Sequence, residues 1–211
     1  MTKKVLILGA ASQISHYLIP DLLEQTDAQL TLFARNAQNR LKEYQSKTKI
    51  IDGDWTNSEE LLAALKGQDI VYLATVPNTK TSEVIVRTMK QANVKRLIVA
   101  GGLGIFDEVA GKFGEWNARM IGDYSAIKEA SFTLCDKDLD VTFLRMSWLY
   151  DQDNNTKYEI VPEGKPYKGT QVTRQAVAQL ITNIVKKPSL YNNQNIGVVE
   201  PNTEWDKPSF Y

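Results

Sequence analysis

The sequence predicts an α/β protein, with a doubly wound parallel sheet and helices on both faces of that sheet. Two observations support this fold class. Short apolar runs alternate along the chain with amphipathic stretches, which is the rhythm of strands joined by crossover helices. The apolar runs are also nearly continuous instead of alternating with polar residues, as expected for strands that are buried on both sides.

Helical patterns follow most of the expected strands. The helix expected over residues 58–66 carries its own end signals, with polar residues before it, acidic residues in its first turn and Gly67 after it. Parallel strands connected in this way require right-handed crossovers. The expected strands are residues 4–8, 30–34, 48–51, 69–74, 96–100 and 141–145, and the expected helices are residues 12–25, 58–66, 80–92 and 122–136.

The chain after Arg145 departs from this rhythm. Residues 150–171 are polar and rich in turn formers, which predicts a loop with a short hairpin. One more helix is expected over residues 173–187 and a final strand over residues 195–200. We therefore expect residues 1–211 to form a single domain, in which residues 146–211 supply a small lid and a peripheral tail.

Composition and charge exclude several classes of function. The chain of 211 residues is long enough for one domain with a large core, and its 25 basic residues balance its 25 acidic ones. This balance gives no reason to expect nucleic acid or an anionic membrane as a partner. The single Cys135 and the single His16 exclude a disulfide framework and thiol- or histidine-based metal sites. Cys135 is expected to be a buried structural thiol, and the early first strand leaves no room for a signal peptide, so we expect a cytoplasmic location.

The stretch VLILGAASQISHYLIP, residues 5–20, has the strand–glycine–helix layout of a dinucleotide-binding turn. Where that turn usually has three glycines, this chain has Gly9, Ser12 and Ser15. Gly9 keeps the tight turn, Ser12 is a good helix N-cap whose hydroxyl can donate to a phosphate, and Ser15 is still small. Backbone N–H groups at a helix start attract anions whatever the side chains are. The alternative is a tight βα turn of an unrelated α/β protein.

The end of the second expected strand indicates which cofactor fits. An NAD site usually places an acidic residue there, which accepts a hydrogen bond from the ribose 2′-hydroxyl. This chain has Arg35 instead, with Arg40 as a second candidate. A guanidinium matches the charge and the geometry of a 2′-phosphate, so these residues favour NADP(H) over NAD(H). The alternative is a solvated arginine at a strand end.

Several segments together resemble the atypical short-chain dehydrogenase/reductase superfamily, in its NmrA-like, NAD(P)H-binding branch. The segments are ILGAASQI, LFAR, GDWTNSEELLAALKGQDIVYLAT, VKRLIVAGGLGIFDE and LDVTFLRMSWL. The resemblance spans almost the whole chain and implies a Rossmann-type sheet with NADP(H) along its carboxyl edge and a small substrate lid from the carboxy-terminal part. It implies these contacts: Gly9, Ala11, Ser12, Gln13 and Ile14 with the pyrophosphate, Arg35 with the 2′-phosphate, Asp54 and Trp55 with adenine, and Ala74, Thr75 and Val76 beside the ribose.

The resemblance also implies catalytic residues, but the match is uneven. Family enzymes that transfer a hydride often use a Tyr, a Lys four residues later and a Ser at the end of the fifth strand. Tyr124 and Lys128 match the first two at the i, i+4 spacing of one helix face. In these roles Tyr124 would polarise the substrate carbonyl, and Lys128 would lower the pKa of the tyrosine and contact the ribose. Residues 100–102, Ala-Gly-Gly, occupy the place of the serine, and a lost oxyanion contact costs about 10²–10³ in rate.

Two functions therefore remain open. The first is an NADPH-dependent oxidoreductase that reduces a small carbonyl, quinone or flavin-like acceptor, because a planar acceptor stacked on nicotinamide needs little help from Ser or Tyr. The second is a non-catalytic NADP(H)-binding redox sensor, which the missing serine favours. We expect a small-molecule substrate, and a homodimer or a regulatory protein as partner. Trp116, Trp148 and Tyr150 are expected either to line a substrate pocket or to pack beneath the lid.

Overall fold

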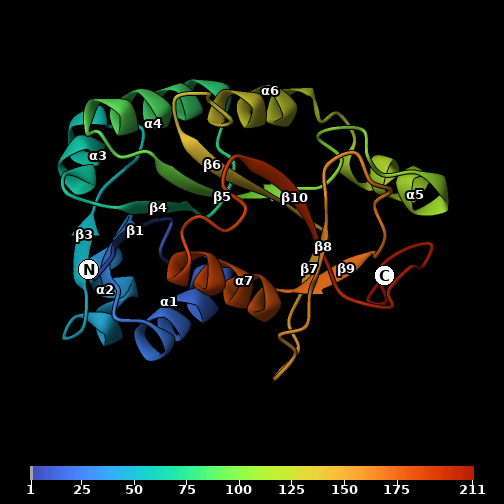
Figure 1. The fold of residues 1–211 in the computed structure, drawn as a ribbon, viewed down its shortest axis with the longest axis horizontal. Helices are drawn as coiled ribbons and strands as arrows, with labels where there is room; N and C mark the ends of the chain where they lie inside the picture. Colours follow the sequence, from blue (N-terminus) through green and yellow to red (C-terminus); the bar gives the residue numbers. More distant parts are fainter. Residues whose placement is uncertain (1) are drawn as a thin grey trace.

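The computed structural model describes residues 2–211 and has one large sheet at its centre (Figure 1). Its eight strands follow the order β3-β2-β1-β4-β5-β6-β10-β8. Neighbouring strands are parallel throughout, except that β8 pairs antiparallel with β10. The strands of this sheet are β1 (Lys4–Leu8), β2 (Gln29–Ala34), β3 (Lys49–Asp52), β4 (Ile70–Leu73), β5 (Arg96–Gly102), β6 (Asp140–Met146), β8 (Glu159–Val161) and β10 (Gln194–Val199).

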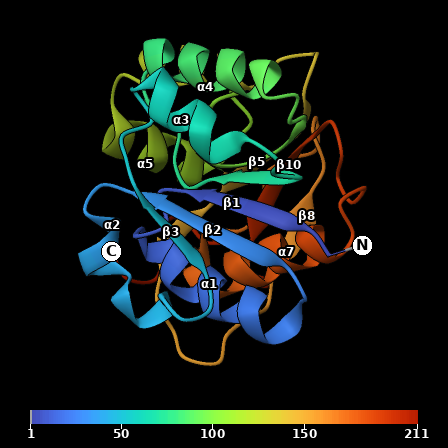
Figure 2. The ribbon, with the colours of Figure 1, turned by 90° about the vertical axis from the view of Figure 1, so that its left-hand side faces the viewer.

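Helices cover both faces of the sheet, which confirms the predicted fold class. Figures 1 and 2 show α1 and α7 on one face and α3, α4 and α6 on the other. Each layer buries its own apolar cluster against the sheet. The helices are α1 (Gln13–Gln25), α2 (Ala37–Arg40), the 3₁₀ turn η1 (Lys42–Tyr44), α3 (Ser58–Leu65), α4 (Thr79–Gln91), α5 (Gly111–Ile121), α6 (Ser125–Leu134) and α7 (Arg174–Lys186).

The strand order reverses between β1 and β4, and Gly9 marks this point. After β1 the chain crosses to β2 on one side, whereas β4 and β5 follow on the other side. Ligands of doubly wound sheets bind in the crevice at such a reversal, beyond the carboxyl ends of the strands. Gly9 has a φ of +84°, and a Cβ at this position would lie 2.9 Å from the Ala74 Cβ. Only glycine fits this turn without strain.

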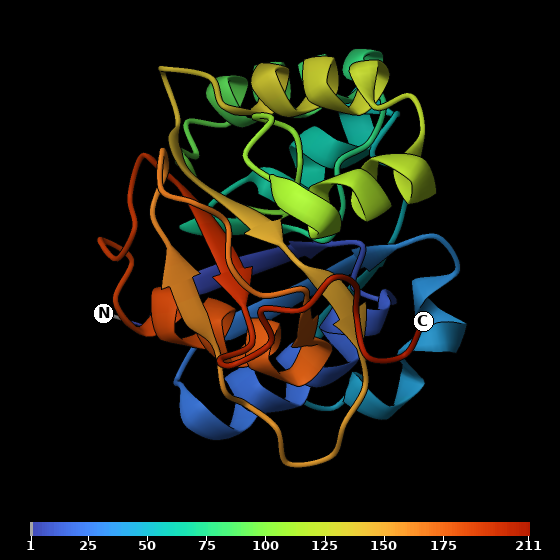
Figure 3. The ribbon, with the colours of Figure 1, turned by 90° about the vertical axis from the view of Figure 1, so that its right-hand side faces the viewer.

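The carboxy-terminal third differs from the expectation in its pairing. The hairpin expected within residues 150–171 is wrong, because β8 pairs with β10, and β7 (Trp148–Tyr150) pairs in parallel with β9 (Gln171–Thr173). These partners are distant in sequence, so local turn signals could not reveal them. Within residues 146–211, α7 and β10 belong to the core, whereas Figure 3 shows the tail, in red, crossing the end of the molecule near β7 and β9.

Two further expectations need correction. Helix α5 was not expected, since its sequence GKFGEWNARMI contains two glycines that weaken a helical pattern. Cys135 is exposed and not buried, because it lies at the C-cap of α6, beyond the last helical turn. Within residues 2–211, the structure contains no helix that is both long and apolar enough to cross a membrane.

The packing of α1 against the sheet and α7 can be tested with Leu18→Ala. Leu18 is 0% exposed, so its truncation leaves a cavity and should lower the free energy of unfolding by about 3 kcal/mol. Chemical denaturation measures this loss. Met120→Ala is the control, because Met120 is 46% exposed, and it should change stability by less than about 0.5 kcal/mol. Equal small losses for both variants would contradict this packing.

Candidate active site

The turn after β1 is held by hydrogen bonds between its two serines and Gly9. Ser12 is the N-cap of α1, and its Oγ accepts a hydrogen bond of 3.2 Å from the Ser15 backbone N–H. The Ser15 hydroxyl is buried and donates to the Gly9 carbonyl at 3.0 Å. Ser15 stands where the usual turn has its third glycine, and its side chain hydrogen-bonds to Gly9 within the turn. The N–H groups of Gln13 and Ile14, in the first turn of α1, have no acceptor in a preceding turn and suit an anion.

A cleft of about 340 Å³, here called the outer cleft, opens beside this turn. It brings the predicted 2′-phosphate and adenine residues together at the ends of β1, β2 and β3. The Arg40 guanidinium is held here, since its Nη2 donates to the Ala11 carbonyl at 3.0 Å. The residues that line the outer cleft are Gly9, Ala11, Ser12, Phe33, Ala34, Arg35, Arg40, Gly53, Asp54, Trp55 and Thr56.

Asp54 is ionised, and one of its two carboxylate oxygens accepts hydrogen bonds within the outer cleft. Its Oδ1 accepts hydrogen bonds from the Thr56 backbone N–H at 2.9 Å and from the Thr56 hydroxyl at 2.8 Å. These bonds lower the pKa of Asp54 below its usual value, and the positive charge of Arg35 lowers this pKa further. The carboxylate of Asp54 and the guanidinium of Arg35 therefore lie in one cleft with opposite charges.

A second cleft of about 310 Å³, here called the inner cleft, lies at the ends of β4, β5 and β6. Ser12 lines both clefts, so the phosphate turn lies between them. The predicted residues Gln13, Ile14, Ala74, Thr75, Val76 and Tyr124 all line the inner cleft, together with Ala100, Gly101, Gly102, Ile127, Met146, Leu149 and Arg174.

The structure gives a steric reason for the glycines that replace the family's serine. A Cβ at Gly101 would overlap the Phe143 ring, and a Cβ at Gly102 would overlap the Tyr124 hydroxyl. The Tyr124 hydroxyl therefore occupies the space that a side chain at residue 102 would need. Tyr124 is the N-cap of α6 and lines the inner cleft, while its catalytic role stays a prediction.

Lys128 lies in a different place from Tyr124. It lines a side pocket of about 440 Å³ between α5, α6 and the segment after β5, and Tyr124 separates this side pocket from the inner cleft. The Lys128 Nζ lies 2.7 Å and 2.8 Å from the two carboxylate oxygens of Asp107. A contact between Lys128 and a ribose stays a prediction, and it requires the side chain to leave Asp107.

The environment of Tyr124 keeps its hydroxyl protonated. Burial raises the pKa of Tyr124 above its usual value, and the negative charge of Glu108 raises it further. The usual activation of a catalytic tyrosine works in the opposite direction, through a nearby lysine that lowers this pKa. At neutral pH, Tyr124 can donate a hydrogen bond but does not act as a base.

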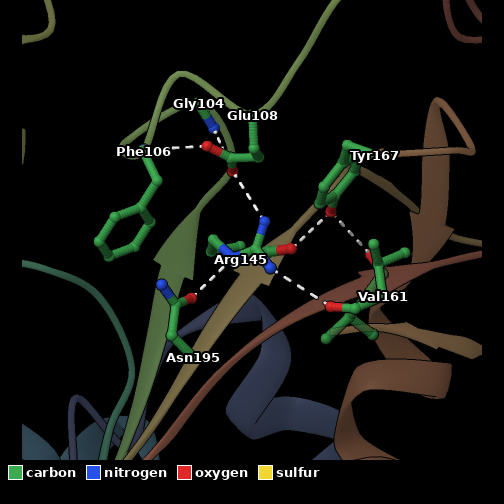
Figure 4. Close-up of polar contacts among 8 residues, drawn as sticks. Gly104, Phe106, Glu108, Arg145, Val161, Tyr167 and Asn195 are labelled. Atoms are coloured by element: carbon green, nitrogen blue, oxygen red, sulfur yellow. Dashed lines mark hydrogen bonds and ion pairs between the residues drawn. The ribbon is translucent and has the colours of Figure 1, made fainter. Parts of the chain in front are cut away.

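Sequence reasoning missed the buried ion pair of Arg145 and Glu108, whose side chains are 1% and 8% exposed (Figure 4). The Arg145 Nη1 lies 3.2 Å from the Glu108 Oε1. One signal was available in the sequence, because an arginine inside an apolar strand pattern needs a buried acceptor. Its acidic partner lies in an irregular segment, which the pattern could not identify.

The aromatic residues of the carboxy-terminal region pack beneath the tail. The Trp116 ring lies 4.8 Å from the Trp148 ring and 5.1 Å from the Tyr211 ring, measured between centroids. Tyr150 stacks on Phe210 at 5.5 Å. Of the two roles expected for these aromatic residues, the structure shows the packing role.

The contact between Gly102 and Tyr124 can be tested with a double-mutant cycle. Gly102→Ala places a methyl group against the Tyr124 hydroxyl and should lower the free energy of unfolding by about 1–2 kcal/mol. In a Tyr124→Phe background the same methyl group meets the ring at 3.7 Å, an ordinary contact, so the loss should be smaller. Thermal or chemical unfolding of the four proteins gives the coupling, expected at about 1 kcal/mol. Additive losses would show that the hydroxyl does not occupy this space.

Comparison with known proteins places this site in a family. The family model described as NAD(P)H-binding matches residues 9–188. A short-chain dehydrogenase/reductase of Veillonella parvula, solved in complex with NADP, is 30% identical over the full length of both chains, with a TM-score of 0.94. A Rossmann-fold NAD(P)-binding family protein of Shigella flexneri is 36% identical over the full length of both chains, with a TM-score of 0.83.

A more distant structure shares the fold alone. An anaerobillin reductase of Escherichia coli O157:H7 is 19% identical over 98% of this chain and 100% of its own, with a TM-score of 0.78. A search of curated protein sequences finds no significant match to this chain. The narrower NmrA-like placement stays a prediction. The matched family model and the two full-length relatives show that the chain belongs to the NAD(P)H-binding family, as a Rossmann-type member of the short-chain dehydrogenase/reductase superfamily.

Proposed function

We propose that this protein is an NADPH-dependent reductase that transfers a hydride to a planar acceptor, of the quinone or flavin type, in the inner cleft. The observation that carries this proposal is the protonated Tyr124 beside two glycines at the end of β5, within a cleft that shares Ser12 with the phosphate turn. The start of α1 would hold the pyrophosphate of the cofactor, and the residues of the inner cleft, among them Gly101, Gly102 and Tyr124, would bind its nicotinamide.

The residues of the outer cleft favour the binding of NADP(H) over the binding of NAD(H). Arg35 and Arg40 both line this cleft, and both guanidinium groups are exposed there and can contact an anion. Arg40 is already anchored through Ala11 to the phosphate turn, so part of its side-chain entropy is lost before a ligand binds. The Veillonella parvula relative, solved with NADP, supports the same choice of cofactor.

Bound NADPH would supply a hydride, that is, two electrons and one proton in a single transfer. The residues of this chain would bind and orient the two reactants. Apolar side chains of Val76, Met146 and Leu149 line the inner cleft and exclude water from a flat ring. Tyr124 would donate a hydrogen bond to an acceptor oxygen or nitrogen as negative charge develops on it, and solvent would supply the second proton.

Reduction of an isolated ketone is less well supported than reduction of a planar acceptor. Ketone reduction requires an acid that gives its proton to the alkoxide, usually a tyrosine whose pKa is lowered by a lysine and whose partner is a serine. Here Lys128 is paired with Asp107, glycine takes the place of serine, and the pKa of Tyr124 is raised. A quinone or flavin delocalises the charge it gains and depends less on such an acid.

Arg35→Ala should weaken the binding of NADPH much more than that of NADH. A charge-assisted contact with the 2′-phosphate contributes about 1.5–3 kcal/mol, so the Kd for NADPH should rise by about 10–100-fold. The Kd for NADH should change little. Calorimetric titration of both cofactors with the wild-type protein and the variant measures this difference. An equal loss for both cofactors would remove Arg35 from the 2′-phosphate site.

Turnover with a panel of quinones, flavins and aldehydes tests the proposed chemistry. The absorbance of NADPH should fall with quinones or flavins, and Tyr124→Phe should lower kcat by only about tenfold, because it removes one hydrogen bond. Loss of all activity in Tyr124→Phe, with aldehydes as the preferred substrates, would support Tyr-dependent carbonyl reduction instead. Firm NADPH binding with no turnover of any acceptor would support the redox sensor.

A further inference from the structure

One segment contacts both Tyr124 and Lys128. Residues 102–108, here called the tether loop, begin at the last residue of β5 and lead toward α5. Gly102 leaves the space that the Tyr124 hydroxyl occupies. Asp107 has a left-handed φ of 56°, and its carboxylate holds Lys128. This loop therefore contacts both side chains.

Glu108 holds the tether loop in this conformation from its own end. Its Oε1 accepts a hydrogen bond from the Gly104 backbone N–H at 2.9 Å, and its Oε2 accepts one from the Phe106 backbone N–H at 2.9 Å (Figure 4). Both bonds are charge-assisted and lie away from bulk solvent, where such bonds are strong. Because of these two bonds, the backbone at Gly104 and Phe106 curls around the carboxylate of Glu108, the last residue of the loop.

Arg145 fixes the Glu108 carboxylate to the sheet. Besides the contact with Glu108, its Nε donates to the Asn195 Oδ1 at 2.6 Å and its Nη2 donates to the Val161 carbonyl at 3.2 Å. The Tyr167 hydroxyl donates to the Arg145 carbonyl at 2.5 Å, and the Tyr167 ring lies 5.5 Å from the guanidinium carbon. Glu108 is thereby tied to β6, β8 and β10, three neighbouring strands of the main sheet.

We propose that Glu108, anchored by Arg145, is a positioning residue for Tyr124 and Lys128, since it holds the tether loop in the one shape that places both. This proposal rests on the proposed function for the effect on turnover, but the effect on Tyr124 itself does not depend on turnover. A merely structural ion pair would affect stability and leave kcat of the folded protein unchanged.

The charges around Tyr124 make its ionisation a direct reporter of Glu108. The charged residues of the two cavities that Tyr124 lines are Asp107, Asp123, Lys128 and Arg174. Lys128 is paired with Asp107, and Arg174 is paired with Asp151 at 3.0 Å. Changing Glu108 removes the negative charge that raises the pKa of Tyr124, and it also removes the carboxylate that holds the loop carrying Asp107.

Glu108→Gln is the first test. The glutamine keeps the size of the side chain but removes the negative charge that raises the pKa of Tyr124, so the phenol should ionise at lower pH than in the wild type. The titration is read from the phenolate absorbance, as the difference between each protein and its Tyr124→Phe counterpart, without cofactor. With NADPH and an acceptor, kcat should fall about tenfold or more while KM for NADPH stays unchanged, because Glu108 lines neither the outer nor the inner cleft. Glu129→Gln, an exposed charge loss on α6, is the control and should alter neither.

The double variant Glu108→Gln with Arg145→Met separates the loss of the loop's acceptor from the effect of an unpaired Arg145. It removes both charges together, which a fold tolerates better than one unpaired buried charge. The Tyr124 titration should stay at lower pH, as in Glu108→Gln, and kcat should stay low because the loop has lost its carboxylate acceptor. An unmoved titration in Glu108→Gln, or full kcat in the folded double variant, would overturn the proposal. If the wild-type protein oxidises no NADPH with any acceptor, the proposed function fails. An unmoved Tyr124 titration in Glu108→Gln would still overturn the role of Glu108, because both the lost charge and a released loop would change the surroundings of Tyr124.

Discussion

The reversal of strand order between β1 and β4 is the constraint on which the site depends. Because the chain turns away to β2 on one side and continues from β4 to β5 on the other, the carboxyl ends of these strands border a crevice that no crossover fills. Gly9 can pass between Ala74 and Trp55 only because it has no Cβ. The start of α1 then lies at the crevice, and both clefts extend from this one turn.

The chemistry proposed for the inner cleft depends on the steric contacts and the charged residues around Tyr124. Because residue 102 is a glycine, the Tyr124 hydroxyl occupies the space that a serine side chain would need. The site therefore has the tyrosine hydroxyl without a serine hydroxyl beside it. The negative charges of Asp107 and Glu108 then act on the two residues that a ketone reductase would use, since one binds Lys128 and the other raises the pKa of Tyr124. These charges are the reason why we propose a planar acceptor and not an isolated ketone.

Much of this fold could be predicted from the sequence, and the failures have physical causes. The parallel strands were visible because each is a short apolar run buried on both faces, and Arg35 and the turn around Gly9 occupy fixed places at strand ends. The pairings β7–β9 and β8–β10 join residues distant in sequence, so no local pattern carries them. Tyr124 was found by its spacing from Lys128, but the same spacing could not show that Asp107 holds the lysine or that Glu108 faces Arg145.

The central claim is that NADPH gives its hydride directly to an acceptor in the inner cleft. The most direct measurement is a single turnover in stopped flow, with NADPH carrying deuterium at the transferred position and a quinone as acceptor. Our account predicts rapid loss of NADPH absorbance, slowed by the deuterium, with the label found in the reduced acceptor or exchanged from it. Oxidation of bound NADPH no faster than in the absence of protein would contradict it.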